Sequence, residues 1–464
     1  MAAVGLRRRG PAGRGVPRLD MPVALVWLGA VGLALVAAAA LVLVPNPLFL
    51  VPPALTGALM LVLGIESLIA LAFLGAAGLL PFVDSGGYAV GNLPVWLFFF
   101  ALGCGLMLLA WAMRVLDRRP SRPLEPNLLV VVLIVYFIFT VVRLAASEPL
   151  SIPSLSAEFI GFPTAALVTY LWLSHDEALA GLRRALPVIV LVVASWAAMY
   201  VAGSAGCEPC RAWVDTGRIR SGLLGGNDRL YTAGQNAFLG LVLIAFGQLL
   251  RRFTPSVAVL TLLGAGAIAL QASRAQYFGF MAGALVLLVW KFWRVRVVGR
   301  VLLVLATVAG LAALLSTPAG DRALSAYQEV SSQGGTAGFR FQILQNSSEN
   351  WSAFGLGVFS QIFGKGFNTD LGLPNTLLVL GYFGGFLQIA LLVLAAMRGA
   401  LSRTLTGATV AGIFVMVLVA RPTLPLIEYG HSGVAYGVAL GFAAALHTRT
   451  SLRRRAPAAL TPTR

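Results

Sequence analysis

Arg274 is the residue of this sequence whose position points most directly to chemistry. It follows Gln271, Ala272 and Ser273 at the junction of two apolar runs that leave almost no room for a loop. Because an arginine at membrane depth is costly, it tends to face a protein interior or an aqueous cavity. Ser273, Gln276 and Tyr277 add hydrogen-bonding groups, and a helix that begins beside an arginine favours anions. The alternative is an interfacial arginine that reaches lipid phosphates; we favour a functional role.

A second group of arginines lies in the connection 204–232 between two apolar runs. Its members are Arg211, Arg218, Arg220 and Arg229. Because arginine binds phosphate and carboxylate through paired N–H donors, the group predicts an anionic ligand. The alternative is that the four side chains are solvated and partly paired with Glu208, Asp215 and Asp228. The sequence leaves these two interpretations open.

The longest polar stretch, Thr317 to Leu373, contains Arg340 and interrupts an otherwise apolar chain. Binding and catalytic residues concentrate in loops held by a rigid scaffold. A loop of this length without elements of its own is typically functional or disordered. Its glycine-rich end, 364–367, lacks the spacing of a phosphate-binding P-loop. We therefore interpret that end as a tight turn before a helix that begins near Pro374 and Asn375.

These residues require a scaffold of membrane-spanning helices. The chain has 464 residues, of which 58% are hydrophobic and 11% charged, which excludes an ordinary soluble domain. The predicted spans lie near 21–44, 48–64, 66–83, 94–115, 127–146, 157–174, 184–203, 233–250, 254–272, 276–293, 298–316, 373–397, 404–421 and 430–447. The predicted fold class is therefore all-α, a polytopic membrane protein with about 12–14 spans, because the second and third runs could form one broken hairpin.

The positive charge is distributed as a topology signal. A net charge of +17 is compatible with nucleic-acid binding, but the basic clusters outside the connection 204–232 fall on one face of a fourteen-span arrangement. Basic residues mark cytoplasmic connections, so both termini are expected inside and 204–232 and 317–372 outside. Nucleic acid is excluded as a partner, and the lipid bilayer is the expected surroundings.

The chain is divided accordingly into four parts. Residues 1–20 and 449–464 are expected to be basic cytoplasmic tails. Residues 21–203 are expected to form the N-terminal transmembrane helices. Residues 204–448 then form a second membrane domain, which includes the extracytoplasmic loop 317–372.

Several segments of that second domain together resemble the O-antigen ligase and polymerase superfamily. Ala272-Ser273-Arg274, opening an apolar helix, is similar to the Ser-Arg signature of the family. The segments 363–367, 374–376 and 381–385 are similar to the turn that closes its long extracytoplasmic loop and to the helix that follows. Arg340 lies where the second functional arginine of the family is expected. The resemblance extends from Ser221 to Leu394.

The resemblance implies a bacterial membrane glycosyltransferase of GT-C-like architecture in the inner (plasma) membrane. Such enzymes take a polyprenyl-diphosphate-linked glycan at the extracytoplasmic face and transfer it to another lipid-linked saccharide (a polymerase) or to a lipid acceptor (a ligase). The diphosphate is the leaving group, so no cofactor and no metal are expected. Other polysaccharide-assembly proteins are expected as partners.

The resemblance also implies roles for individual residues. Arg274 and Arg340 would clamp the diphosphate. The expected substrate-binding residues are Arg211, Arg218, Arg220, Gln235, Asn236, Ser273, Tyr277 and Asn375. Among them Gln235, Asn236 and Tyr277 would orient sugar hydroxyls.

The sequence departs from the family near the end of the long loop. The ligase branch has a histidine there, where this chain has Pro374. Glu428 and His431 are the candidates to assist the incoming hydroxyl. The alternative is that these two residues form an ordinary interfacial pair. The choice between polymerase and ligase stays open.

Two further alternatives concern the cysteines and the function. Cys207-Glu208-Pro209-Cys210 has no second pair or nearby histidine for zinc. A local disulfide is the first interpretation and redox activity the second, and the sequence leaves open whether the bond forms. A transporter or flippase of lipid-linked oligosaccharide is the main alternative function. Transporters carry polar or charged residues at mid-membrane and often have related halves. The predicted spans are largely free of charge, which favours surface chemistry.

Overall fold

The computed structural model describes most of the chain from residue 65 onward. The described residues are 65–80, 89–90, 93–117, 127–146, 153–174, 176–204, 207, 210, 219–220, 229–230, 234–251, 255–271, 274–295, 297–301, 305, 345, 348–356, 372–422, 424, 426–428 and 430–446. The chain divides into two units, Met1–Gly64 and Ile65–Arg464, and all described residues belong to the second. The predicted spans 21–44 and 48–64, most of 298–316, most of the loop 317–372 and both predicted tails lie outside them.

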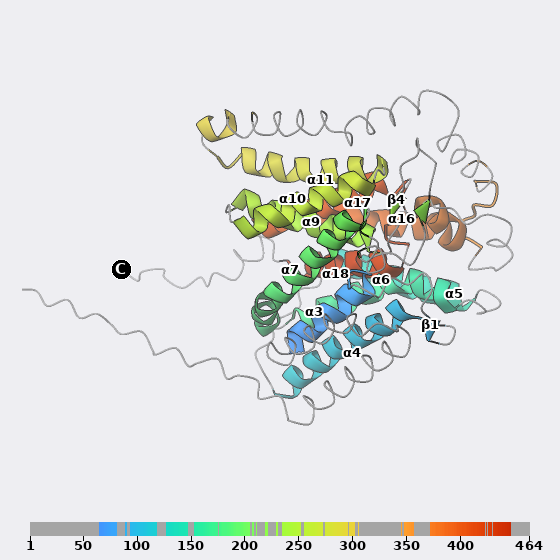
Figure 1. Ribbon diagram of the computed structural model, residues 1–464. Helices are drawn as coiled ribbons and strands as arrows, with labels where there is room; N and C mark the ends of the chain where they lie inside the picture. Colours follow the sequence, from blue (N-terminus) through green and yellow to red (C-terminus); the bar gives the residue numbers. More distant parts are fainter. Residues whose placement is uncertain are drawn as a thin grey trace, which may run out of the picture. The chain divides into compact units, whose positions relative to one another are not determined.

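Eleven α-helices are present in the part of the chain that the structure describes (Figure 1). They are α3 (Ile65–Ala76), α4 (Val95–Leu116), α5 (Leu128–Ala145), α6 (Pro153–Trp172), α7 (Asp176–Ser204), α9 (Gln235–Arg251), α10 (Pro255–Gln271), α11 (Arg274–Phe292), α16 (Gly372–Leu401), α17 (Leu405–Ala420) and α18 (Gly430–Ala445). Each predicted span that falls on described residues is a helix, which confirms the all-α fold class.

Four of these helices are long and apolar enough to cross a membrane. They are α4, α5, α11 from Ala275 onward, and α16. The shorter apolar helices include α3, α9 and α17. The chain is thus an α-helical protein with candidate membrane-spanning helices, and the total of about 12–14 spans stays a prediction.

Side-chain caps explain where two of the helices begin. Asn127 Oδ1 accepts a hydrogen bond from the Val130 amide at 3.1 Å, and Thr404 Oγ1 accepts one from the Gly407 amide at 3.0 Å. Such caps satisfy amides that have no partner inside the helix. Asn127 Nδ2 also donates to the Ala444 carbonyl at 3.2 Å. The start of α5 is therefore tied to the end of α18.

Two short antiparallel hairpins interrupt the helical pattern in the described residues. Strand β1 (Ala89–Val90) pairs with β2 (Leu93–Pro94), and β3 (Ile219–Arg220) pairs with β4 (Arg229–Leu230). The sequence analysis did not predict them, because two residues are too few to show the alternation typical of a strand. The second hairpin pairs Arg220 with Arg229 in register, so two arginines of the predicted anion-binding group occupy opposite positions.

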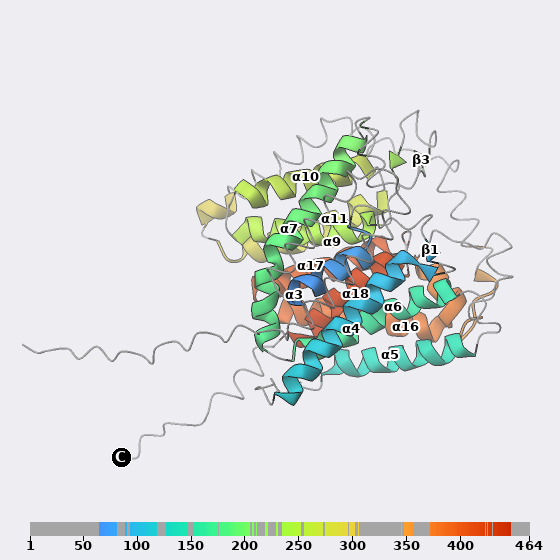
Figure 2. The ribbon, with the colours of Figure 1, turned by 60° about the horizontal axis from the view of Figure 1, so that its bottom comes forward.

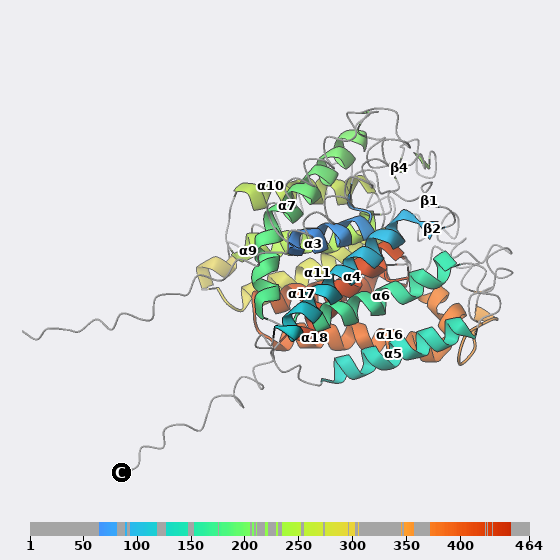
Figure 3. The ribbon, with the colours of Figure 1, turned by 90° about the horizontal axis from the view of Figure 1, so that it is seen from below.

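Helix α18 lies near the middle of the described helices (Figures 2 and 3) and contacts α3, α4, α6, α9, α16 and α17. Glycines on α18 allow the backbone of α6 to approach closely. A methyl group added at Gly437 would lie 2.3 Å from the Phe162 carbonyl oxygen, and one at Gly441 would lie 2.6 Å from that of Ala166. Small residues at helix contacts are typical of membrane helix packing.

Replacing Gly283 of α11 with alanine is expected to destabilise the contact between α11 and α17. The added methyl group would lie 2.7 Å from both the Gly412 carbonyl oxygen and Leu243 Cδ1. Overpacking of this kind lowers the free energy of unfolding by about 1–3 kcal/mol. Thermal unfolding in detergent measures the effect. Gly266→Ala in α10 is the matched control, because its methyl group would have no neighbour within 4 Å; equal melting temperatures for the two variants would contradict the packing.

One end of the helix bundle carries basic residues, and we call it the basic end. Lys291 Nζ donates to the Leu250 carbonyl at 2.6 Å, and Arg398 Nε donates to the Ala443 carbonyl at 2.9 Å. A buried ion pair, Arg114 Nη2 to Glu66 Oε1 at 3.3 Å, lies there as well. These contacts join the end of α11 to the end of α9, the end of α16 to the end of α18, and the end of α4 to the start of α3.

Candidate functional site

The starts of four helices that carry predicted site residues lie at the opposite end of the bundle, which we call the convergent end. They are α9 at Gln235, α11 at Arg274, α16 at Gly372 and α18 at Gly430, and α17 ends there at Ala420. The start of a helix carries a partial positive charge and amides without a partner inside the helix. Helix starts gathered in this way favour an anion.

Asn236 joins the starts of α9, α11 and α18. Its Oδ1 accepts a hydrogen bond from Gln276 Nε2 at 2.9 Å, and its carbonyl accepts one from the Tyr436 hydroxyl at 2.7 Å. All three side chains are buried. Arg274 lies two residues before Gln276, so its backbone is at this junction. Gln276 Oε1 has no hydrogen-bond partner among the described residues, which leaves a buried acceptor there.

A buried ion pair lies beside α16 at the same end. Arg421 Nε donates to Glu428 Oε1 at 2.9 Å, and both side chains are only 2% exposed. Arg421 Nη2 donates to Thr376 Oγ1 at 3.2 Å and also to Gln388 Oε1. The Thr376 hydroxyl lies 2.9 Å from both Gln388 Oε1 and Glu428 Oε1. We call these four residues the ion-pair cluster; its hydrogen bonds offset the cost of removing two charges from water.

Glu428 also lies against the start of α16. Its Oε2 accepts a hydrogen bond from the Ile427 amide at 3.2 Å, and a methyl group added at Gly372 would lie 2.9 Å from it. The Leu373 amide donates to the Arg421 carbonyl at 3.3 Å. A carboxylate at the start of a helix is stabilised by the helix dipole. Glu428 therefore serves as the counter-charge that holds Arg421 next to α16.

His431 is half-buried in the first turn of α18. Its Nδ1 lies 2.9 Å from the Ala76 carbonyl oxygen. Because a carbonyl only accepts, Nδ1 carries the proton of this hydrogen bond, and the neutral ring then has its lone pair on Nε2. The ring also packs against Trp96, with 5.4 Å between ring centroids. His431 thus ties the start of α18 to the end of α3 and the start of α4.

Helix α16 is interrupted at Gly381, whose φ of 70° and ψ of −172° are not helical. The described segment 352–356 of the polar stretch runs beside the interruption. The backbone hydrogen bonds between them are from Tyr382 N–H to the Ser352 carbonyl (3.0 Å), from Phe383 N–H to the Ala353 carbonyl (3.0 Å) and from Leu356 N–H to the Leu378 carbonyl (2.7 Å). A break in a membrane helix requires such partners for the freed backbone groups.

The break separates two members of the ion-pair cluster. Thr376 lies on the half 372–380, and Gln388 lies on the half that continues from 382 to 401. Arg421 bonds to both, so the cluster holds the two halves of α16 in one arrangement. From α5, Arg143 Nη2 donates to the Gly355 carbonyl at 2.6 Å. This bond fixes the polar segment from its other side.

Replacing Gly381 with alanine is expected to disrupt the break. A residue with a side chain is strained at φ 70°, and the added methyl group would lie 2.2 Å from the Gly355 amide nitrogen. Strained backbone of this kind costs about 1–3 kcal/mol. Amide hydrogen exchange should become faster at 353–356 and at residues 382 and 383.

The matched control for this change is Gly385→Ala, four residues further along α16. There the closest atom to an added methyl group is the end of the Leu377 side chain at 2.8 Å, which can move. Unchanged exchange at 353–356 in Gly381→Ala would show that the segment does not depend on the break.

Aromatic side chains surround the break and are largely exposed. Phe354, Tyr382 and Phe386 are 60%, 53% and 68% exposed. Phe383 lies between Phe354 and Phe139 of α5, with ring centroids 6.3 Å and 5.0 Å away. We call Phe354, Tyr382, Phe383 and Phe386 the aromatic patch; such surface is suited to lipid chains.

The predicted site residues that the structure places lie mostly at the convergent end. Gln235, Asn236 and Glu428 are buried there, and His431, Tyr277 and Asn375 are half-buried in the first turns of α18, α11 and α16. Arg274 begins α11, and Arg220 lies in β3. Arg211, Arg218, Ser273 and Arg340 lie outside the described residues. The roles of all these residues stay predictions.

Three members of the ion-pair cluster, Arg421, Thr376 and Gln388, were missed by the sequence analysis. Arg421 ends the predicted span 404–421 on the expected outer side, which is the same exception to the charge rule that drew attention to Arg211 and Arg218. Gln388 is a polar residue inside the predicted span 373–397. Thr376 belongs to a segment that the resemblance covers but was given no role.

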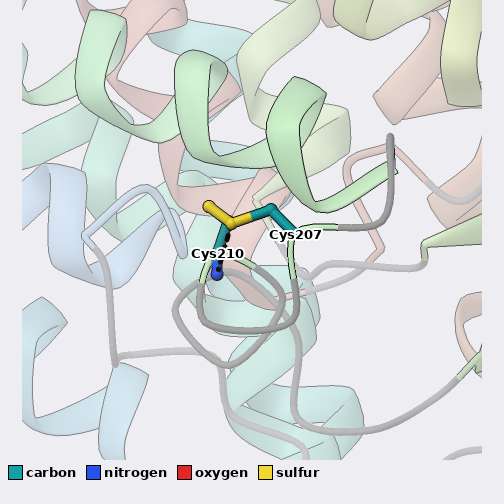
Figure 4. The surroundings of a disulfide bond; sticks show 2 residues. All are labelled: Cys207 and Cys210. Atoms are coloured by element: carbon teal, nitrogen blue, oxygen red, sulfur yellow. Dashed lines mark hydrogen bonds between the residues drawn. A yellow bond between two sulfur atoms is a disulfide. The ribbon is translucent and has the colours of Figure 1, made fainter.

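Cys207 and Cys210 form a disulfide (Figure 4), a bond that the sequence analysis left open. The third cysteine, Cys104, is buried in α4 with a free thiol. A disulfide that closes a loop of four residues restricts the unfolded chain little, and the loop-entropy relation gives about 2 kcal/mol. Its contribution to stability is thus small compared with that of bridges over long loops.

Among the described residues, no group of three or more His, Cys, Asp or Glu side chains lies close enough to hold a metal ion. No family model matches the chain, and no curated protein matches it. The fold and the site define its class: an α-helical protein with candidate membrane-spanning helices and a buried ion-pair cluster at one end of the bundle.

Proposed function

We propose that this chain is a bacterial membrane glycosyltransferase that moves a polyprenyl-diphosphate-linked glycan onto another lipid-linked saccharide or onto a lipid acceptor. The observation that carries the proposal is the convergent end. There the starts of α9, α11, α16 and α18 come together beside the ion-pair cluster. The predicted residues Arg274, Asn236, Glu428 and His431 come from separate parts of the sequence and belong to this end.

The charge distribution supports an extracytoplasmic convergent end. The basic end carries Arg114, Lys291, Arg294, Arg398 and Arg403. Because basic residues favour the cytoplasmic side, this end faces the cytoplasm in our proposal. The convergent end then opens toward the other face of the plasma membrane, where lipid-linked glycans are consumed.

The proposed reaction exchanges one bond for another at the anomeric carbon of the donor sugar. The bond from that carbon to the diphosphate oxygen breaks, and a bond from the acceptor hydroxyl oxygen forms. Negative charge develops on the departing polyprenyl diphosphate, and positioned cations and helix starts stabilise it. Arg274 and Arg340 are the proposed cations, with the start of α11 behind Arg274.

Polar groups around Asn236 and His431 would orient the sugars and receive the proton. Gln276 Oε1 is a buried acceptor with no partner among the described residues, and the half-buried Tyr277 is on the next position of α11. His431 is the proposed acceptor for the proton of the incoming hydroxyl. Glu428 has Arg421, Thr376 and Ile427 as described partners, so we assign it a positioning role.

The aromatic patch supports sideways entry of a lipid substrate. Phe354, Tyr382 and Phe386 are exposed beside the break in α16. An apolar isoprenoid chain that packs there would bring its diphosphate to the same end of the bundle as Asn375 and Arg274. The segment 352–356 would then border both the lipid and the sugar.

A strain that lacks the gene, complemented with wild-type protein or with Arg274→Ala at matched membrane levels, tests the proposal. A polymerase defect should leave single repeat units, and a ligase defect should leave long chains on the polyprenyl lipid. Arg251→Ala is the control, because Arg251 is exposed at the basic end. If the strain with Arg274→Ala makes surface glycan of normal amount and chain length, the enzymatic proposal is wrong.

A flippase or transporter of lipid-linked oligosaccharide is the second candidate, and the break in α16 favours it. Interrupted helices and buried charges near a substrate site are typical of transporters. Loss of a flippase would leave the lipid-linked glycan in the cytoplasmic leaflet. Loss of a transferase would leave it in the outer leaflet, so a membrane-impermeant lectin that labels intact spheroplasts distinguishes the two.

A further inference from the structure

The Cys207–Cys210 disulfide lies in the connection that follows α7 and is accessible to solvent. Both residues are half-exposed. The Cys207 amide donates to the Ala202 carbonyl at 3.0 Å, so Cys207 is attached to the last turn of α7. Cys210 instead begins the chain that leads to the strand Ile219–Arg220. The disulfide therefore joins a helix end to the connection that carries the arginine group.

The two sulfur atoms are not equivalent. The Cys210 amide donates to Cys207 Sγ, with 3.3 Å between nitrogen and sulfur (Figure 4). An N–H donor stabilises negative charge on sulfur, as it does at reactive thiolates. In disulfide exchange the sulfur that is better stabilised as a thiolate leaves faster. Cys207 is therefore the better leaving group of the pair.

The third cysteine of the chain does not compete with Cys207 and Cys210 in disulfide exchange. The chain contains three cysteines, and the third, Cys104, is buried within α4. After reduction, Cys207 and Cys210 can re-form only their own bond without unfolding of that helix. The separation of three residues keeps both sulfurs near each other in the reduced chain, which favours a reversible cycle.

We infer that Cys207–Cys210 is an exchange-active disulfide for a dithiol protein of the extracytoplasmic space, and that Cys210 Sγ is the sulfur attacked. A thiolate of the partner bonds to Cys210 Sγ, the Cys207–Cys210 bond breaks, and Cys207 leaves as a thiolate that then takes a proton. The second thiolate of the partner attacks its own sulfur in the mixed disulfide and releases Cys210. The chain is reduced to two thiols, and the partner is oxidised to a disulfide.

Reduction would loosen the attachment of the arginine-bearing connection to α7. Cys207 keeps its backbone hydrogen bond to Ala202, whereas Cys210 loses its side-chain link to Cys207 and stays joined to it only through the backbone. The hairpin of β3 and β4, which contains Arg220 and Arg229, contacts α7 and α10 through β4. The redox state of the pair would thus act on the position of these arginines, whatever anion they bind.

Reduced glutathione, a monothiol probe, tests the direction of attack on purified full-length protein in detergent. The reaction is stopped early with N-ethylmaleimide, and the two cysteines are mapped by peptide mass spectrometry. Glutathione on Cys210 with maleimide on Cys207 is expected in about tenfold excess over the reverse pattern. Cys104→Ser should give the same pattern, because Cys104 takes no part.

Two results would overturn the inference. One is an adduct mainly on Cys207, or equal adducts on both cysteines. The other is a disulfide that resists millimolar dithiothreitol while the protein keeps its native melting temperature. Neither result depends on glycan transfer, so the inference and the proposed function fail independently.

Discussion

Replacing Arg421 with alanine is expected to lower the free energy of unfolding by about 3–5 kcal/mol, the usual cost of removing one partner of a buried ion pair. The change leaves the Glu428 carboxylate buried without its counter-charge. It also removes a donor from Thr376 and Gln388, which lie on the two halves of α16. The break in α16 should loosen together with the segment 352–356.

Thermal unfolding of the purified protein in detergent measures this loss. Arg251→Ala, a change at an exposed arginine of the basic end, is the matched control and should be nearly neutral. The double change Arg421→Met with Glu428→Leu should lower the free energy of unfolding less than Arg421→Ala does, because it removes both buried charges. If Arg421→Ala and Arg251→Ala have the same melting temperature, the ion-pair cluster does not stabilise this end of the bundle.

Replacing Arg274 with alanine is expected to slow glycan transfer by about 10²–10³-fold, the effect of losing one group that stabilises developing negative charge. The loss should appear in kcat, since the diphosphate gains charge only as its bond to the sugar breaks. Arg274→Lys should recover part of the rate, because it keeps the charge but not the paired donors of a guanidinium group.

Transfer rates in membranes of matched protein content check this expectation, and Arg340→Ala should show a similar loss. The melting temperature of Arg274→Ala should stay near that of the wild type, which separates loss of chemistry from loss of fold. A normal kcat for Arg274→Ala would exclude Arg274 from the reaction.

The helices could be predicted from the sequence because each is one long apolar run. The ends of these runs also predict where helices begin. Asn236, Glu428 and His431 could therefore be located near helix starts. Their partners could not be predicted. Gln276 and Asn236 are forty residues apart, and no local pattern shows that they bond.

The break in α16 was also invisible in the sequence. The run 373–397 is predominantly apolar, and glycines such as Gly381 are common in membrane helices. The break depends on the segment 352–356, which supplies hydrogen bonds from another part of the chain. Likewise, the sequence identifies Arg421 only as the end of a predicted span. Its pairing with Glu428 depends on the turn after α17 folding back, and no sequence pattern shows that turn.

The central claim, glycan transfer at the convergent end, is tested most directly with purified protein in liposomes. The liposomes contain a polyprenyl-diphosphate-linked saccharide, and the measured quantity is the free polyprenyl diphosphate formed with time. Release that accompanies saccharide growth or transfer, and that falls about 10²–10³-fold with Arg274→Ala, is the expected result. Movement of intact lipid-linked saccharide between leaflets, with no diphosphate released, would contradict it.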